Sequence, residues 1–243
     1  MKRARAPRWI FTCEHAGHAV PRAYGTLGLA RADLRDHIGW DIGAAGVARE
    51  AARRLSAPLV ASRYSRLLID LNRAPDERSL IVERSDGRPV PGNQSVTAAE
   101  RRRRIRLYHA PYHDRVDRVV SRTLQRSEGQ EVRLLSMHSF TPSLDGRSRP
   151  FDVGVLFDEH PGPAHRLGRA LRRLGLRVRY NEPYSGLDGL IYAARRHGLA
   201  HGIVYLELEV NNALVRTRSG IATMGRHVAR ALAQMDGAVG NAK

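Results

Sequence analysis

The chain has 243 residues, of which 42% are hydrophobic and 27% are charged, a composition typical of a globular protein that can bury one sizeable core. Its formal net charge of +17 comes from arginines scattered along the whole chain rather than gathered in a stripe with aromatic residues. This distribution argues against specific nucleic-acid binding, whereas the positive surface would attract a small anionic substrate.

Cys13 is the only cysteine, which excludes an internal disulfide and a metal cluster built from thiolates. A metal site in this chain must therefore use histidines and carboxylates. The basic segment 1–8 is followed by too few apolar residues for a signal sequence or a membrane span, so we expect a cytoplasmic protein without membrane contact. We expect one catalytic domain over residues 1–243, with loosely held ends at 1–8 and 237–243.

Short apolar runs rich in β-branched residues alternate with segments of helical periodicity. The predicted strands cover residues 9–13, 59–62, 67–71, 132–137, 153–157, 176–180 and 203–209. The predicted helices cover residues 41–55, 97–125, 164–174, 189–197 and 220–235. This alternation predicts an α/β fold with three layers, in which helices flank a mixed, mostly parallel sheet. Ligands should gather at the carboxyl ends of its strands.

The predicted helix 97–125 has two unusual features. Residues 101–104 are four consecutive arginines, and the apolar positions that follow define the opposite face of the helix. We interpret the arginines as a solvated face rather than a nucleic-acid site. Pro111 lacks a backbone N–H, so it should kink the helix or divide it in two.

Two predicted strands end in histidines. Strand 9–13 leads into His15, and strand 132–137 leads into His138. A strand-end histidine is by itself more often an ordinary loop residue, but catalytic zinc sites use three His and carboxylate ligands. Asp41, at the start of a predicted helix, is our leading third ligand, although it could instead be a helix-capping acid. His18 and His37 are the alternative third ligands.

A second pattern suggests substrate binding. The apolar run 67–71 ends in Asn72 and Arg73, and an arginine fork matches the geometry of a carboxylate. These residues, with Arg66, are candidates for binding the carboxylate of a substrate; the alternative is a turn asparagine beside a surface arginine. Three residues of a later loop and helix end could shape the same pocket: Asn181, Tyr184 and His197.

Strand 203–209 places acids on one of its faces. Its alternation puts Glu207 and Glu209 on the same side as Tyr205. Neighbouring acids on one face are costly unless a cation or a metal-bound water lies opposite. The flanking Ile, Val and Leu residues favour an interior strand over an exposed edge strand, and we expect Glu209 to act as a general base.

Taken together, these segments resemble the N-formylglutamate amidohydrolase family from about residue 10 to 230. The motifs that carry the resemblance lie at residues 14–17, 40–44, 65–73, 138–142 and 181–185 and in the glutamate strand. The resemblance implies a fold similar to zinc carboxypeptidases and aspartoacylases, in which an Asp-Leu-Asn-Arg segment like 70–73 holds the substrate carboxylate. In that wider group the position three residues after the first histidine is a zinc-binding glutamate, whereas this chain has His18 there.

The resemblance also implies an activity, namely zinc-dependent cleavage of N-formyl-L-glutamate or a related small N-acyl amino acid. Zinc would be held by His15, Asp41 and His138. The glutamate strand departs from the family pattern, because Asn211 and Ala213 replace an arginine and an aspartate. Two alternatives therefore remain: a basic protein that uses a hydrolase scaffold to bind nucleic acid or an acidic partner, and a catalytically degenerate family member.

Overall fold

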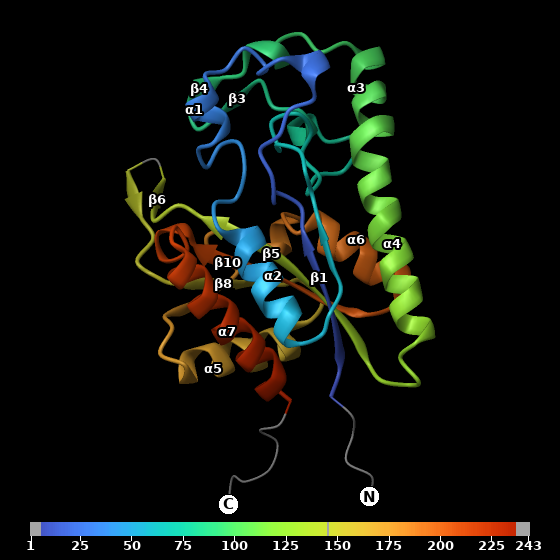
Figure 1. Ribbon diagram of the computed structural model, residues 1–243, viewed down its shortest axis with the longest axis vertical. Coiled ribbons are helices and arrows are strands. Elements are labelled where there is room, and N and C mark those ends of the chain that lie inside the picture. The colour runs from blue at the N-terminus through green and yellow to red at the C-terminus, as the bar shows by residue number, and fades with distance from the viewer. Residues whose placement is uncertain (1–5, 145, 237–243) are drawn as a thin grey trace, which may run out of the picture.

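A six-stranded sheet runs through the centre of the computed structural model, which describes residues 6–144 and 146–236 (Figure 1). Its strands are β1 (Arg8–Cys13), β2 (Leu59–Ala61), β5 (Val132–Phe140), β8 (Val153–Leu156), β9 (Val178–Tyr180) and β10 (Val204–Asn211). The strand order is β2-β1-β5-β10-β8-β9, and every neighbouring pair is parallel except β10 and β8. The mixed, mostly parallel sheet predicted from the sequence is confirmed.

Helices cover both faces of this sheet. The longer helices are α2 (Ala44–Arg54), α3 (Ala98–Arg104), α4 (Ala110–Gln125), α5 (Pro161–Arg173), α6 (Tyr192–His201) and α7 (Arg218–Gln234). Figure 1 shows α2, α5 and α7 grouped together, while α4 and α6 lie across the sheet from them. The short elements are α1 (Arg31–Leu34) and 3-10 turns at Arg22–Tyr24, Arg78–Leu80, Pro91–Asn93, Gly186–Asp188 and Asn212–Leu214. Among the described residues, no helix has the length and apolar character required to cross a membrane.

The interior strands are apolar on both sides because both sides are covered. In β5, Leu135 and Met137 pack with α2, α5 and α7, whereas the preceding Leu134 packs toward α4 and α6. Each such fully buried side chain contributes about 1.5–3 kcal/mol to folding. The near-continuous apolar runs of the sequence therefore reflect a sheet buried between two helical layers.

Two hairpins stand outside the main sheet, on the side where its parallel strands end. One pairs β3 (Arg84–Ser85) with β4 (Arg88–Pro89), and the other pairs β6 (Ser143–Leu144) with β7 (Arg147–Ser148). Both contribute residues to the cavity described below.

The predicted break at Pro111 is confirmed. Thr97 caps α3 by accepting a hydrogen bond from the Glu100 amide, and a π-helical segment, Ile105–His109, separates α3 from α4. Pro111 cannot donate to the carbonyl of Leu107, so the α-helical pattern is interrupted just before it.

The predicted strand at 67–71 is wrong, because this segment forms turns and irregular backbone. Leu67 and Leu68 are buried as expected, but their backbone carbonyls are satisfied by side chains. The Asn93 amide donates to the Leu67 carbonyl, and the Arg104 guanidinium donates to the Leu68 carbonyl. Buried polar backbone needs partners, and here distant side chains replace a neighbouring strand.

Arg104 also corrects the interpretation of the four arginines. Its side chain is only 2% exposed and donates to Oδ1 of the Asn93 side chain at 2.7 Å and to Glu100 at 3.0 Å. Arg102 and Arg103 are exposed as predicted.

At the N-terminus, Arg8 is the first residue of β1 rather than part of a loose segment, since its amide donates to the Glu131 carbonyl. Residues 1–5 and 237–243, also predicted to be loose, lie outside the described residues.

Replacing Gly198 in α6 with alanine should destabilise the fold. The added methyl carbon would lie 1.9 Å from Cδ1 of the Tyr205 ring, which is fully buried. We expect urea denaturation to show a loss of roughly 1–3 kcal/mol, the usual cost of overpacking. In Gly162→Ala, a matched change in α5, the nearest atom would be 3.6 Å away at the end of a flexible arginine, so that variant should be unaffected or slightly more stable. Equal stability of the two variants would contradict the packing described here.

Candidate active site

A cavity of about 420 Å³ lies at the carboxyl ends of β1, β5 and β10, where the sequence predicted that ligands would gather. Segments far apart in the chain form its walls, including both hairpins. Most of the predicted site residues line it, namely His15, His37, Asp41, Arg66, Asn72, Arg73, His138, Tyr184 and Glu209.

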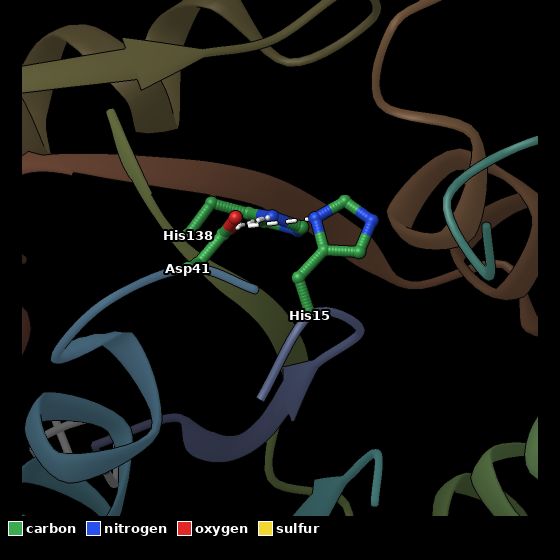
Figure 2. Close-up of side chains that lie close together, drawn as sticks. All are labelled: His15, Asp41 and His138. Atoms are coloured by element: carbon green, nitrogen blue, oxygen red, sulfur yellow. Dashed lines mark hydrogen bonds and ion pairs between the residues drawn. The ribbon is translucent and has the colours of Figure 1, made fainter. Parts of the chain in front are cut away.

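His15, Asp41 and His138 converge at the base of this cavity (Figure 2). Nδ1 of His138 lies 2.8 Å from Oδ2 of Asp41, and Nδ1 of His15 lies 3.4 Å from the same oxygen. All three side chains are at most 5% exposed. The backbone supports the arrangement, because the Asp41 amide donates to the His15 carbonyl and brings the start of the α2 segment against the end of β1.

The second nitrogen of each ring is already committed to another carboxylate. Nε2 of His15 lies 2.6 Å from Oδ1 of Asp70, and Nε2 of His138 lies 3.1 Å from Oε2 of Glu14. The surrounding acids raise the pKa of His138 well above its usual value against the effect of burial. With a proton on Nε2 alone, as a bound metal would require, each ring would direct an Nδ1 lone pair at Asp41. His15 Nδ1 has no hydrogen-bond partner although it is buried. Three potential ligand atoms thus face one point, where a proton on His138 or a bound cation relieves the repulsion between them.

The electrostatics of the two flanking carboxylates agree with these roles. Burial alone would raise the pKa of Glu14, but hydrogen bonds from His138 and Ser136 and the charge of His138 lower it to about 2. Burial likewise opposes ionisation of Asp70, yet the charge of Arg66 and the hydrogen bond from His15 hold its pKa well below the usual range. Both acids are therefore ionised acceptors that orient the imidazoles.

Glu207 and Glu209 project from β10 toward the same cluster, on the interior strand predicted from the sequence. Both are buried, and burial together with neighbouring acids raises the pKa of Glu207 to about 8 and that of Glu209 to about 7, against the opposing charge of His138. Oε2 of Glu209 has no hydrogen-bond partner. Glu209 is thus a buried acid whose free oxygen is available to a bound water or substrate.

The alternative third ligands lie elsewhere. His18 is exposed, with its ring 5.1 Å from that of Trp40. His37 lies at the cavity wall, where Nδ1 contacts Asp36 and Nε2 contacts Asp86 of the β3–β4 hairpin, at 3.1 and 3.0 Å. The structure brings Asp41, and neither of these histidines, together with His15 and His138.

The predicted carboxylate-binding residues line one wall of the cavity. Arg66 donates to Asp70 at 2.7 Å and lies 3.7 Å from Asp41, so its charge is largely neutralised. The Asn72 side chain is fully engaged, because it accepts from the Ala193 amide and donates to Glu207 and to a backbone carbonyl. Arg73 donates to the carbonyl of Asn72. Asn72 therefore braces this wall, and Arg73 presents its guanidinium to the cavity.

Two predicted substrate contacts are not part of the cavity. The side-chain oxygen Oδ1 of Asn181 accepts hydrogen bonds from the backbone amides of Phe157 and Gly186. Asn181 therefore shapes the loop that carries Tyr184. His197 is completely buried between α4 and α6, where its ring contacts His113 at 2.9 Å and Asp117 at 2.6 Å. Its position at a helix end does not reveal that it points away from the site.

Sequence reasoning missed the roles of Glu14 and Asp70. Both lie within motifs noted from the sequence, one beside His15 and the other at the start of the Asp-Leu-Asn-Arg segment. A chemical rule could have pointed to these two acids, because a metal-binding histidine usually donates its second N–H to a carboxylate. Which acid served which histidine depended on contacts 55 and 124 residues apart in the chain.

Comparison with known proteins places the chain among the amidohydrolases. Residues 8–216 match the family model described as N-formylglutamate amidohydrolase. The chain belongs to this family, as the sequence resemblance indicated. No curated protein matches the chain.

Solved structures share the fold of this chain. A gene product of Agrobacterium tumefaciens is 32% identical, with a TM-score of 0.91 over 97% of this chain and 92% of its own length. An N-formylglutamate amidohydrolase from Ralstonia eutropha is 22% identical and shares the fold, with a TM-score of 0.72 over 96% of this chain and 93% of its own.

The buried His113 should make the fold acid-sensitive. Burial, reinforced by His109 and His197, lowers the pKa of His113 to about 2, whereas an unfolded histidine titrates near 6.5. Below pH 6.5 the unfolded chain therefore binds a proton that the folded chain does not, and stability falls as pH decreases. Between pH 6.5 and 5.5 this residue should cost about 1 kcal/mol in urea denaturation. His113→Gln should reduce the loss by that amount, while the matched variant of the exposed His18 should retain it; identical slopes would refute this account.

Proposed function

We propose that the protein is a zinc-dependent hydrolase that cleaves the amide bond of an N-acyl amino acid, with zinc held by His15, Asp41 and His138. The observation that carries the proposal is the convergence of two imidazole lone pairs and a carboxylate on one buried point. Ligands about 2.1 Å from a tetrahedral zinc lie about 3.4 Å apart, a spacing close to that between His15 and Asp41. His, Asp and His are suitable donors for catalytic zinc.

When bound, zinc supplies Lewis acidity, which polarises a carbonyl and makes water more acidic. Glu209 would accept the proton of the attacking water and deliver it to the leaving amine. Its position supports this role, since it lies next to His138 across the β10–β5 pairing and has an unpartnered oxygen. Its raised pKa, caused first by burial, suits a group that both accepts and releases a proton near neutrality.

Arg73 would bind the carboxylate of the substrate. Arg73 lines the cavity, and its ion pair within residues 6–144 and 146–236 is a long one, 3.8 Å from Nε to Glu77. Asn72 holds the adjoining backbone in place through its three hydrogen bonds, which fixes the substrate over the reacting groups. Family membership and this anchor together favour N-formyl-L-glutamate or a related small N-acyl amino acid.

The departures from the family pattern at Asn211 and Ala213 do not interrupt this machinery. The Asn211 side chain donates to the Phe151 carbonyl and accepts from the Ala213 amide, so it caps the turn after β10. Neither residue lines the cavity. The intact cluster therefore supports an active enzyme over a degenerate one.

Metal analysis should find about one zinc ion per chain after dialysis against metal-free buffer. Asp41→Ala should abolish tight binding, and Asp70→Asn should weaken it roughly 10- to 100-fold, since Asp70 orients a ligand without being one. His37→Asn is the matched control and should keep full zinc content. Zinc retained by Asp41→Ala, or lost from His37→Asn, would assign the third ligand differently.

Glu209→Gln should lower kcat for N-formyl-L-glutamate by about 10²- to 10⁴-fold, the range for loss of a general base, with little change in KM. Zinc content should be unchanged. Release of free amine from a panel of N-acyl amino acids, with and without a chelator, measures the effect. Glu159→Gln, at an exposed glutamate remote from the cavity, is the control. Full activity of Glu209→Gln or of the chelated enzyme would disprove the mechanism.

A further inference from the structure

Arg149 carries a guanidinium that the protein does not neutralise. It follows the β6–β7 hairpin and is half-buried. Among the described residues, its side chain has a long hydrogen bond of 3.4 Å from Nη1 to Oγ1 of Thr141 and a hydrogen bond to the Tyr184 hydroxyl. Within residues 6–144 and 146–236, no carboxylate forms an ion pair with Arg149, whereas Arg66 on the same cavity donates to Asp70 at 2.7 Å. A half-buried guanidinium with unused donors requires an acceptor.

The position of Arg149 is fixed in advance. Its amide donates to the Pro142 carbonyl at 2.8 Å, and its carbonyl accepts from the Phe151 amide at 2.9 Å, so the backbone is held on both sides. The guanidinium carbon lies 5.3 Å from the ring centre of Tyr184 and 6.0 Å from that of Phe140. Stacking on aromatic faces orients a guanidinium while leaving its in-plane donors free.

Arg149 lies beside the candidate active site and lines a neighbouring cavity with Arg179 and Glu182. Phe140, Thr141 and Tyr184, which its side chain contacts, line the candidate active site. Its positive charge acts on Glu209, where it opposes the burial that raises the pKa. Arg149 is therefore close enough to act on the general base electrostatically, and it comes from a different wall than Arg73.

The distribution of charge indicates what this donor binds. Asp70 and Asp41 neutralise Arg66, and Arg73 is assigned above to the first carboxylate of the substrate. Arg149 remains for a second acidic group, and a guanidinium fork pairs best with a carboxylate. We propose that Arg149 is a specificity-determining residue that binds the side-chain carboxylate of an N-acyl acidic amino acid. This inference rests on the proposed function and adds the residue that selects an acidic side chain over a neutral one of the same shape.

The test compares N-formyl-L-glutamate with N-formyl-L-glutamine, which differs only in that side-chain group. In Arg149→Met, kcat/KM for the glutamate substrate should fall roughly 10- to 100-fold, mainly through KM, while the glutamine substrate should change less than about threefold. Arg149→Lys, which keeps the charge but loses the fork, should lie between Arg149→Met and the wild type. Arg147→Met, at an exposed arginine of the same hairpin, should leave both substrates unchanged.

An equal loss with both substrates would overturn the inference, because Arg149 would then act on the reacting groups. An unchanged preference for glutamate would overturn it as well. Calorimetric titration of L-glutamate and L-glutamine separates this inference from the proposed function, since it needs no turnover. If the wild type hydrolyses neither substrate but Arg149→Met selectively loses affinity for L-glutamate, the proposed function fails and the role of Arg149 stands. If both proteins bind the two amino acids alike, the role of Arg149 fails.

Discussion

The convergence of three electron-pair donors on one buried point is the constraint on which the site depends. Nε2 of His15 and Nε2 of His138 each lie against a carboxylate, and Nδ1 of each ring faces the Asp41 carboxylate. Acceptors that face one another without a proton or metal between them repel, and burial removes the water that would screen them. The buried acids of β10 lie on the remaining side of the cluster, where burial raises the pKa of both and a cation would favour their ionised forms.

The parallel strands explain how such a cluster is delivered. β1, β5 and β10 are adjacent and parallel, so their carboxyl ends meet at one edge of the sheet. Of the two acids that contact the histidines, Glu14 directly follows β1, whereas Asp70 comes from a segment outside the sheet. Asp70 lies on an irregular segment whose buried carbonyls are satisfied by Asn93 and Arg104. Arg104 and Asn93 therefore support the site indirectly, since they hold the backbone that carries Asp70.

Charge balance divides the arginines of the cavity into two kinds. Arg66 is paired with acids and belongs to the scaffold of the site. Its positive charge stabilises the ionised form of Asp70, which can then accept a hydrogen bond from His15. In the part of the chain that the structure describes, Arg73 and Arg149 have no carboxylate at hydrogen-bond distance, which leaves them open to an anionic ligand. The large positive net charge of the chain brings such a ligand toward the cavity, whereas the individual geometry of these two side chains determines how it is bound.

The sequence by itself determined the sheet, the helices and the strand-end placement of His15, His138 and Glu209, because hydrophobic periodicity reports which face of a strand or helix is buried. It left Asp41, His18 and His37 as alternatives and assigned His197 to the pocket. Only the tertiary structure decided these positions, and it also replaced the predicted strand at 67–71 with buried turns. The reason is physical: periodicity records that a residue is buried but not which distant group it meets, and the decisive contacts join residues 55 to 124 positions apart.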